Sequence, residues 1–377
     1  MHITFFSFIV AVFWSSLFIV MTYCLRKTNC GRHMMGVLPI TLLYLFSAFR
    51  MFVSIEIIPS VVVESRQIYP AIYRMLRKTC FTGSRFQGTI LSFAIAIWLG
   101  VAAVLLIRYG INYYAARRCV TTYTESGDEQ VRAMNLLIAN KTNTYKIPVY
   151  ISRDVSTSFG MGIFKRAIIM PDRAYQEDEL YYILLHEYTH FKNKDIWVKT
   201  LVSLFCILFW WNPLVYLLKK DLEQTLEVKC DRAVLKRIGV GGKTAYLETL
   251  LHALKQMRRT QKMSYAATTF LQPDRDLEIK ERFGAIAAYK GDNSIKKGSV
   301  LIIVAFSCLM MVSYVFLPQP VYEAPYIANE FVLSESRLEK TANGHYELFI
   351  RGESEGMISD ASAEVFINEG IRVDKGE

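Results

Sequence analysis

The sequence predicts a polytopic α-helical membrane protein into which a mixed α+β domain is inserted. Apolar residues make up 52% of its 377 residues, while charged residues still make up 21%, too many for a chain that lies wholly in lipid. Long apolar runs also flank a polar middle section. We therefore expect one part of the chain in the bilayer and another part in water.

Four apolar runs are long enough to cross the roughly 30 Å hydrocarbon core as helices. They are residues 3–24, 34–58, 89–107 and 300–317. The first has no basic leading segment and no small-residue cleavage site, so we expect a retained span rather than a signal peptide. The predicted organisation is three membrane helices with loops (1–107), an inserted domain (108–298), a last membrane helix (299–317) and a short acidic tail (318–377).

The distribution of Lys and Arg predicts the orientation. Basic clusters follow the first and third runs and precede the fourth, and cytoplasmic loops are the ones that carry such an excess. We therefore expect a multi-pass protein of the cell membrane with its N-terminus outside, the inserted domain in the cytoplasm and the tail outside. The tail, with twelve acidic and five basic residues, fits an outside position. The basic loop 59–88 would also lie outside, against the rule, but the three other basic clusters outnumber it and indicate the side opposite to theirs for it.

The net charge of +10 is spread over the loops that flank the apolar runs, and no base-reading motif occurs. The expected partner is therefore the lipid bilayer, with no direct nucleic acid. A glycine-rich stretch at 239–244 lacks the first glycine of a phosphate loop, because position 237 is Arg, so Gly239 is expected to cap a helix. The seven cysteines are scattered and include no CxxC pair, so the sequence supports neither a disulfide framework nor a cysteine-based zinc site.

The polar section is expected to begin as a compact α+β unit. Residues 129–140 are amphipathic at helical spacing, 147–151 alternate like a strand, and 167–170 form a second apolar strand that Pro171 ends. The stretch Gln176-Glu-Asp-Glu179 supplies acidic residues that favour the start of a helix through its macrodipole, and this helix is predicted to run to about Lys194.

An H-E-x-x-H motif, His186-Glu-Tyr-Thr-His190, lies on that helix. Residues four apart share a helix face, so both imidazoles can ligate one metal ion. Glu187 is turned about 100° from His186, which lets it reach a metal-bound water and act as general base. The alternative is two unrelated histidines one turn apart. With only six histidines in the chain, the motif rarely arises by chance.

A catalytic zinc needs a third protein ligand. The acidic residues Glu223, Glu227 and Asp231 share one face of a later predicted helix. We predict Glu227 as the ligand, with Asp231 orienting a histidine and Asp195, just past the first helix, in a similar supporting part. The alternative is a solvated acidic stripe.

The apolar run 196–218 separates these two groups. If it crossed the membrane, His190 and Glu227 would lie roughly 30 Å apart and could not share an ion. Asn212-Pro213 can cap and start a new helix, so we predict a re-entrant or membrane-hugging hairpin that returns Glu227 to the histidines.

These residues resemble the BlaR/MecR-type integral-membrane zinc metallopeptidases, the antirepressor signal transducers. The matching pieces are His186 to His190 with Asp195, Trp211-Asn-Pro213, and Glu227-Val-Lys-Cys230-Asp231, preceded by the 160–171 stretch. The resemblance covers about residues 1–317. It implies Zn²⁺ at His186, His190 and Glu227, Glu187 as catalytic base, and an inserted HExxH metallopeptidase domain.

The resemblance also implies a protein substrate, such as a winged-helix transcriptional repressor, and self-cleavage of the segment before the last span, where 280–284 is a candidate with an ordinary helix as the alternative. The antibiotic-sensing members continue into a penicillin-binding domain, whereas here we expect a member without it. A homodimer is left open.

Two other functions stay open from the residues. A prenyl-protein or quality-control membrane metalloprotease also pairs H-E-x-x-H with a later E-x-x-x-D. A non-proteolytic membrane signalling protein would keep zinc only structurally, but such a site has no use for Glu187.

Overall fold

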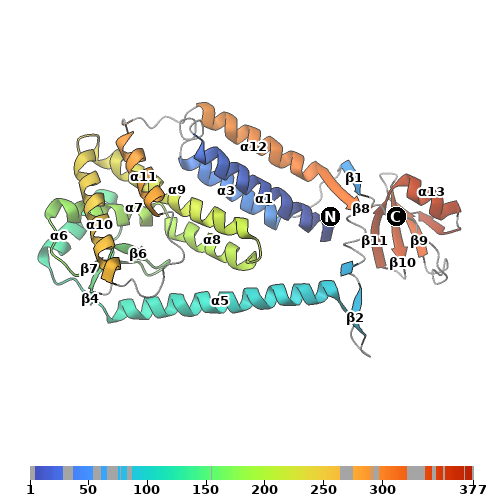
Figure 1. Ribbon diagram of the computed structural model, residues 1–377, viewed down its shortest axis with the longest axis horizontal. Helices are drawn as coiled ribbons and strands as arrows, with labels where there is room; N and C mark the ends of the chain where they lie inside the picture. The colour runs from blue at the N-terminus through green and yellow to red at the C-terminus, as the bar shows by residue number, and fades with distance from the viewer. Residues whose placement is uncertain are drawn as a thin grey trace. The chain divides into compact units, whose positions relative to one another are not determined.

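The computed structural model describes most of the chain, and its elements are labelled in Figure 1. The described residues are 5–28, 37–53, 61–65, 75–76, 78–82, 87–153, 155–263, 275–289, 291, 297–320, 336–341, 345–350, 353–368 and 370–375. They divide into two compact units. One comprises Met1–Ala11, Ser54–Trp98 and Met310–Glu377, and the other comprises Val12–Val53 and Leu99–Leu309.

Among the described residues, three helices are long and apolar enough to cross a membrane: α1 (Phe5–Lys27), α5 (Ile90–Thr122) and α12 (Lys297–Val315). They correspond to the first, third and fourth predicted spans. The second prediction, 34–58, is met by a shorter apolar helix, α3 (Val37–Phe52), while residues 34–36 and 54–58 lie outside the described residues. The predicted class of polytopic helical membrane protein is confirmed.

Helix α5 is longer than the span predicted at 89–107, because it continues to Thr122. The apolar pattern predicts a boundary where apolar residues give way to Arg108. A charged side chain ends a membrane-spanning segment but not a helix, whose backbone hydrogen bonds are internal. The predicted domain boundary at 107/108 therefore falls inside α5.

The inserted domain begins with a small mixed sheet of order β4-β5-β7-β6. Its strands are β4 (Thr124–Glu125), β5 (Val149–Ser152), β6 (Phe159–Met161) and β7 (Ala167–Pro171); β5 pairs with β7 in parallel and the other pairs are antiparallel. On the central strand β7, Ile168 and Met170 belong to one apolar cluster and Ile169 belongs to another. Burial on both faces explains why this strand reads as a continuous apolar run.

Two helices cover this sheet: α6 (Glu129–Thr142) and α7 (Glu177–Lys192). The Asp128 side chain caps α6 by accepting a hydrogen bond from the Gln130 backbone N–H at 2.9 Å. Helix α7 buries Leu180, Leu184 and Tyr188 in the main core. The two strands and two helices predicted for this region are confirmed within a few residues at each end.

The apolar run 196–218 forms a helical hairpin of α8 (Asp195–Leu208) and α9 (Pro213–Ile238). Asn212 caps α9, because its Oδ1 accepts a hydrogen bond from the Leu214 N–H at 3.0 Å. Gly239 ends α9 with φ of +73°, as its sequence context predicted. Helices α10 (Lys243–Met263) and α11 (Arg275–Ala287) follow, and α11 packs against α9 and α10.

The other unit contains a small domain of about forty residues in the tail. Its sheet has the order β11-β10-β9-β12, formed by β9 (Ser336–Lys340), β10 (Tyr346–Ile350), β11 (Glu353–Ile358) and β12 (Arg372–Lys375). Helix α13 (Asp360–Asn368) contributes Phe366 to a core with Leu338 and Leu348. Two short ladders complete the unit, parallel between β1 (Val61–Ser65) and β8 (Phe316–Pro320) and antiparallel between β2 (Thr79–Thr82) and β3 (Gln87–Thr89). The sequence pattern of the tail predicts none of these elements.

Candidate metal centre

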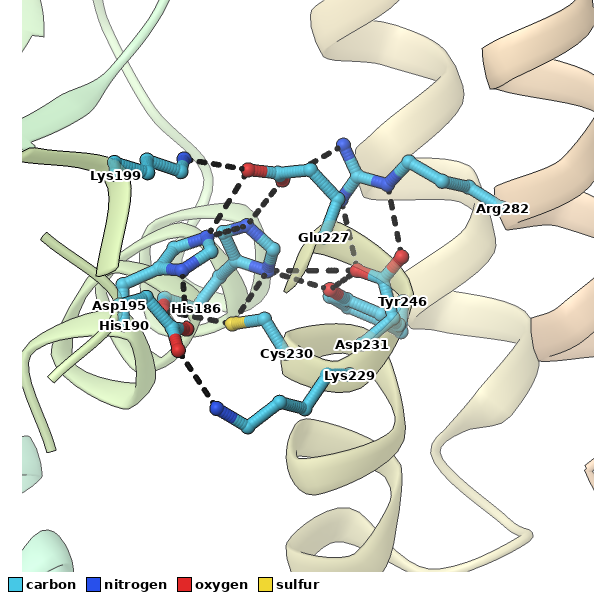
Figure 2. Close-up of polar contacts among 10 residues, drawn as sticks. All are labelled: His186, His190, Asp195, Lys199, Glu227, Lys229, Cys230, Asp231, Tyr246 and Arg282. Carbon is cyan, nitrogen blue, oxygen red and sulfur yellow. Dashed lines mark hydrogen bonds and ion pairs between the residues drawn. The ribbon is translucent and has the colours of Figure 1, made fainter. Parts of the chain in front are cut away.

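His186 and His190 present their Nε2 atoms to one point beside α9, as Figure 2 shows. The two Nε2 atoms lie 3.1 Å apart. From α9, the Glu227 carboxylate brings Oε2 to 3.5 Å from Nε2 of His186 and Oε1 to 3.5 Å from Nε2 of His190. The hairpin thus brings the three predicted ligands together.

These distances fit a zinc ion. Bonds of about 2.0–2.1 Å in a tetrahedral site place ligand atoms about 3.3–3.4 Å apart. The two Nε2 atoms, 3.1 Å apart, lie close to that value, and each has one of the two Glu227 oxygens 3.5 Å away. Two imidazoles and one carboxylate are also the donor set of many catalytic zinc sites, which keep a fourth position open.

Each imidazole is oriented through its other nitrogen. Nδ1 of His190 lies 2.9 Å from Asp195 Oδ2. Nδ1 of His186 lies 2.9 Å from the Tyr246 hydroxyl, which donates to Asp231 Oδ1 at 2.6 Å, and it lies 3.5 Å from that carboxylate oxygen directly. Such contacts fix the tautomer and ring orientation that leave Nε2 available for a metal.

Both supporting carboxylates are fully buried and each has a cation as partner. Lys229 Nζ donates to Asp195 Oδ1 at 2.8 Å. Arg282 on α11 binds Asp231 with two hydrogen bonds, Nε to Oδ2 and Nη2 to Oδ1, both 2.8 Å. A buried carboxylate is costly unless it is paired, and these cations supply the pairing. They contact the carboxylates and not the histidines, so the Nδ1 contacts of His186 and His190 are kept.

Cys230 is a second candidate for the third ligand. Ligand atoms of His186, His190 and Cys230 all lie within 4.8 Å of one another. The Cys230 Sγ lies 3.5 Å from Nδ1 of His186, the nitrogen that Tyr246 already occupies, and it donates to the His186 carbonyl at 3.3 Å. The geometry therefore favours Glu227.

The pKa shifts in the cluster favour a negative Glu227 beside positively charged partners. Burial opposes ionisation of Glu227, but hydrogen bonds from His186 and His190 hold its pKa well below the ordinary value. Burial likewise acts against a charged His186, yet Cys230 and Glu227 raise its pKa to about 10. The pKa of His190 is raised in the same way, with Asp195 contributing. A divalent cation between these groups would supply the charge that protons supply here.

A cavity of about 270 Å³ opens beside the three candidate ligands. Glu187, only 7% exposed, lies in its wall, as do Phe159 and Gly160 of β6. A Cβ built on Gly160 would stand 2.6 Å from the Phe191 ring and 3.3 Å from Glu187 Oε2. Glycine at this position lets β6 pass directly over the helix that carries Glu187.

Two cations flank Glu227 at the cavity. Lys199 Nζ donates to Oε1 at 3.1 Å, and Arg282 Nη1 lies 3.4 Å from Oε2 (Figure 2). Each reaches one oxygen of the carboxylate from a different side. These contacts fix the direction in which Glu227 points.

All six residues singled out from the sequence lie in this cluster or in the cavity wall. Those that the sequence did not identify are Lys199, Lys229, Tyr246 and Arg282. Lys229 stands inside the motif that carries Glu227 and Asp231, where a basic neighbour between carboxylates was a usable signal. Tyr246 and Arg282 come from α10 and α11, and no spacing in the sequence links them to the histidines.

Comparison with known families gives an independent result: the family described as BlaR1 peptidase M56 matches residues 41–286. The chain belongs to this family. The match contains the two histidines, Glu227 and Arg282, so the M56 region includes every residue of the cluster described above.

Individual relatives agree with the M56 assignment. The Regulatory protein BlaR1 of Bacillus licheniformis is 27% identical over 186 residues, 46% of this chain and 29% of that protein. The Methicillin resistance mecR1 protein of Staphylococcus aureus is 30% identical over 155 residues, covering 40% and 26%. BlaR1 of Staphylococcus aureus is 22% identical over 271 residues, covering 67% and 44%. The chain thus spans less than half the length of these relatives.

Proposed function

We propose that this M56 family member is a membrane-embedded zinc metalloendopeptidase that hydrolyses peptide bonds on the cytoplasmic side. The observation that carries the proposal is the convergence of His186 Nε2, His190 Nε2 and the Glu227 carboxylate, within 3.5 Å of one another, beside a cavity that Glu187 lines. The three residues would hold the zinc, which when bound polarises a carbonyl and lowers the pKa of water.

Glu187 is the proposed catalytic base. It follows His186 directly, so the helix turns it away from the ligand positions and into the cavity wall. Its carboxylate can accept a proton from the attacking water and deliver it to the leaving amine. Glu187 is only 7% exposed, so bulk solvent competes little with a water held beside it in the cavity.

The edge strand β6 supports a polypeptide substrate. Within the described sheet β6 pairs only with β7, and Phe159 and Gly160 line the cavity. An extended peptide can add to such an edge by main-chain hydrogen bonds, which brings a peptide bond to the metal centre whatever its side chains. Tyr182 and Ile183 supply apolar surface in the same cavity.

We further propose a role in signal transduction through cleavage of a cytoplasmic protein, with a winged-helix transcriptional repressor as the substrate class. The support is family membership together with the relatives' descriptions as regulatory and resistance proteins. Self-cleavage at 280–284 has weaker support, because these residues lie within α11 and would have to unwind to enter the site as an extended chain.

The hairpin is proposed to enter the membrane from the cytoplasmic side. Asn212, at its turn, donates to Ser16 of α1 at 3.0 Å, while Arg26 near the end of α1 contacts Asp221 of α9. Ten residues of helix separate Ser16 and Arg26, about 15 Å, so the turn lies about half a bilayer deep along α1. Trp211 at the turn is 42% exposed, as a lipid-facing side chain would be.

Brominated lipids test this depth. In a variant that keeps Trp211 and replaces the other tryptophans by Phe, lipids brominated near the acyl-chain end should quench fluorescence more strongly than water-soluble acrylamide does. A Trp211 quenched mainly by acrylamide would overturn the re-entrant hairpin, and would leave the metal centre unaffected.

Three variants in native membranes test the enzyme. Glu187→Ala should retain zinc and lose cleavage, whereas Glu227→Ala should lose both, and Glu223→Ala, one turn earlier on α9, should lose neither. Zinc content is measured on the purified protein and cleavage by mapping new protein N-termini in the membranes and cytosol. Zinc and cleavage that survive Glu227→Ala would refute the ligand set; new N-termini unchanged by Glu187→Ala would refute the peptidase.

A further inference from the structure

A second buried polar cluster lies where α1, α3, α9 and α11 meet, outside the metal centre. Arg26, in the last turn of α1, is 3% exposed, and its guanidinium donates to Asp221 Oδ2 at 2.6 Å, to Gln224 Oε1 at 2.7 Å and to Glu281. Tyr44 of α3 donates to the same oxygen of Asp221. One arginine from a membrane helix thus ties two other helices together.

This cluster adjoins the metal centre through two consecutive residues of α11. Glu281 binds Arg26 and accepts a hydrogen bond from Gln224 Nε2 at 2.5 Å. The next residue, Arg282, binds Asp231 with two hydrogen bonds and lies 3.4 Å from Glu227. The position of α11 relative to α9 therefore sets both contacts at once.

Helix α9 makes the same connection. Gln224 precedes Glu227 by three residues, so the two lie on neighbouring turns of one helix face. Asp231 follows one turn later. The partners of Arg26 and the partners of Arg282 thus form one row along α9, and α11 covers that row.

Within the described residues, Arg26 is the only cation that pairs with its two carboxylate partners, Asp221 and Glu281. Asp221 is 3% exposed and the Glu281 side chain 24%. Without Arg26 these two carboxylates would face each other across Gln224 with no counter-charge, and the first half of α11 would shift to separate them or admit water. The second half stays anchored, because Ile286 is fully buried in the main core.

We propose that Arg26 is a positioning residue for the metal centre. Through Glu281, the membrane helix α1 holds α11 in the position from which Arg282 orients Asp231 and Glu227. The inference rests on the proposed zinc site and adds to it a mechanical link: a displacement of α1 along the membrane normal changes the geometry of the third ligand. The site is thereby coupled to the membrane helices through named side chains.

Zinc affinity, measured by chelator competition on the full chain in lipid nanodiscs, tests the proposal without any substrate. Arg26→Gln should weaken zinc binding about tenfold, within the range found when groups that orient metal ligands are removed. The matched control is Lys27→Gln, which removes one exposed positive charge from the same helix end and should leave the affinity unchanged. Arg26→Lys, which can reach one carboxylate but not all three partners, should lie between.

A double-mutant cycle separates positioning from general loosening of the fold. Arg282→Gln should weaken zinc binding by itself. Adding Arg26→Gln to it should cause little further loss, because Arg26 acts on the site through the Arg282 contacts that the first substitution has already removed. Glu281→Gln, which leaves the Arg26–Asp221 pair intact, should reproduce the loss seen in Arg26→Gln. Lys280→Gln, an exposed charge on the same helix, is its control.

Additive effects of Arg26→Gln and Arg282→Gln would overturn the proposal, and so would unchanged zinc affinity in both Arg26→Gln and Glu281→Gln. If Arg26→Gln does not fold, Glu281→Gln alone decides by the same measurement. A wild-type chain that binds no zinc would instead refute the proposed function, and this inference with it. If the wild-type chain binds zinc and the Arg26→Gln variant binds it equally well, the positioning role of Arg26 is refuted and the proposed function is not.

Discussion

Asp195 Oδ2 lies 2.9 Å from Nδ1 of His190, five residues earlier in the chain, although the two residues belong to different helices. The junction between α7 and α8 makes this contact. Lys194 there adopts a left-handed conformation with φ of +59°, which turns the chain so that Asp195 begins the next helix under the histidine.

Replacement of Asp195 by Asn should weaken zinc binding by about 10–100-fold, because the amide no longer provides the charged acceptor that orients His190 and strengthens it as a ligand. Chelator competition measures the loss. Asp178→Asn, in the exposed first turn of α7, is the control and should bind zinc as the wild type does. Equal affinities in Asp195→Asn and the wild type would show that His190 needs no such support.

Removal of the metal should lower thermal stability. A ligand at about a thousand times its Kd stabilises the folded state by roughly 4 kcal/mol, which corresponds to several degrees in Tm for a domain of this size. Scanning fluorimetry in detergent with and without a zinc chelator measures the shift. Glu227→Ala should show almost no chelator-dependent shift; a shift as large as that of the wild type would point to zinc bound elsewhere.

Gly160→Ala should reduce cleavage by about tenfold or more while zinc remains bound. The new methyl group would meet the Phe191 ring at 2.6 Å and Glu187 Oε2 at 3.3 Å, so either β6 or Glu187 must move. Zinc content and the yield of new N-termini are compared with those of Gly127→Ala, where a Cβ meets nothing within 4 Å. Full activity in Gly160→Ala would mean that β6 yields without disturbing the base.

Glu179, in the first turn of α7, should make stability depend on acid pH. Burial favours its neutral form, but hydrogen bonds from Arg173 and His252 lower its pKa below the model-peptide value of 4.5. A lowered pKa adds stability that is complete above 4.5 and disappears as the pH falls through the folded-state value. Glu179→Gln should therefore be destabilised by about 1–2 kcal/mol at pH 7, and by progressively less as the pH falls below 4.5.

Unfolding measured at pH 7 and below pH 4.5 tests this sign. The exposed Glu177→Gln in the same turn should match the wild type at both pH values. A difference between wild type and Glu179→Gln that grows in acid would contradict the ion-pair explanation.

The sequence predicted those parts of the site that depend on local spacing. His186 and His190 share a face because they stand one turn apart, and Asn212 with Pro213 starts α9 because the two residues satisfy its first turn. Glu227 could be predicted only by combining these facts with the need for a third ligand. The hairpin then followed from geometry.

What the sequence did not reveal depends on contacts between distant segments. Tyr246, Arg282 and Arg26 acquire their roles only through packing of α10, α11 and α1 against α9, and each looks ordinary in its own neighbourhood. The tail sheet could not be predicted for a different reason. Its strands mix core residues such as Leu338 and Leu348 with charged neighbours, a much weaker signal than an apolar helix.

The position of Arg282 in the chain bears on biosynthesis. A ribosome finishes the histidines, Glu227 and Asp231 well before it reaches α11, so a nascent chain carries the whole ligand set without the arginine that pairs with Asp231. The metal centre can therefore be completed only when α11 emerges, just ahead of α12.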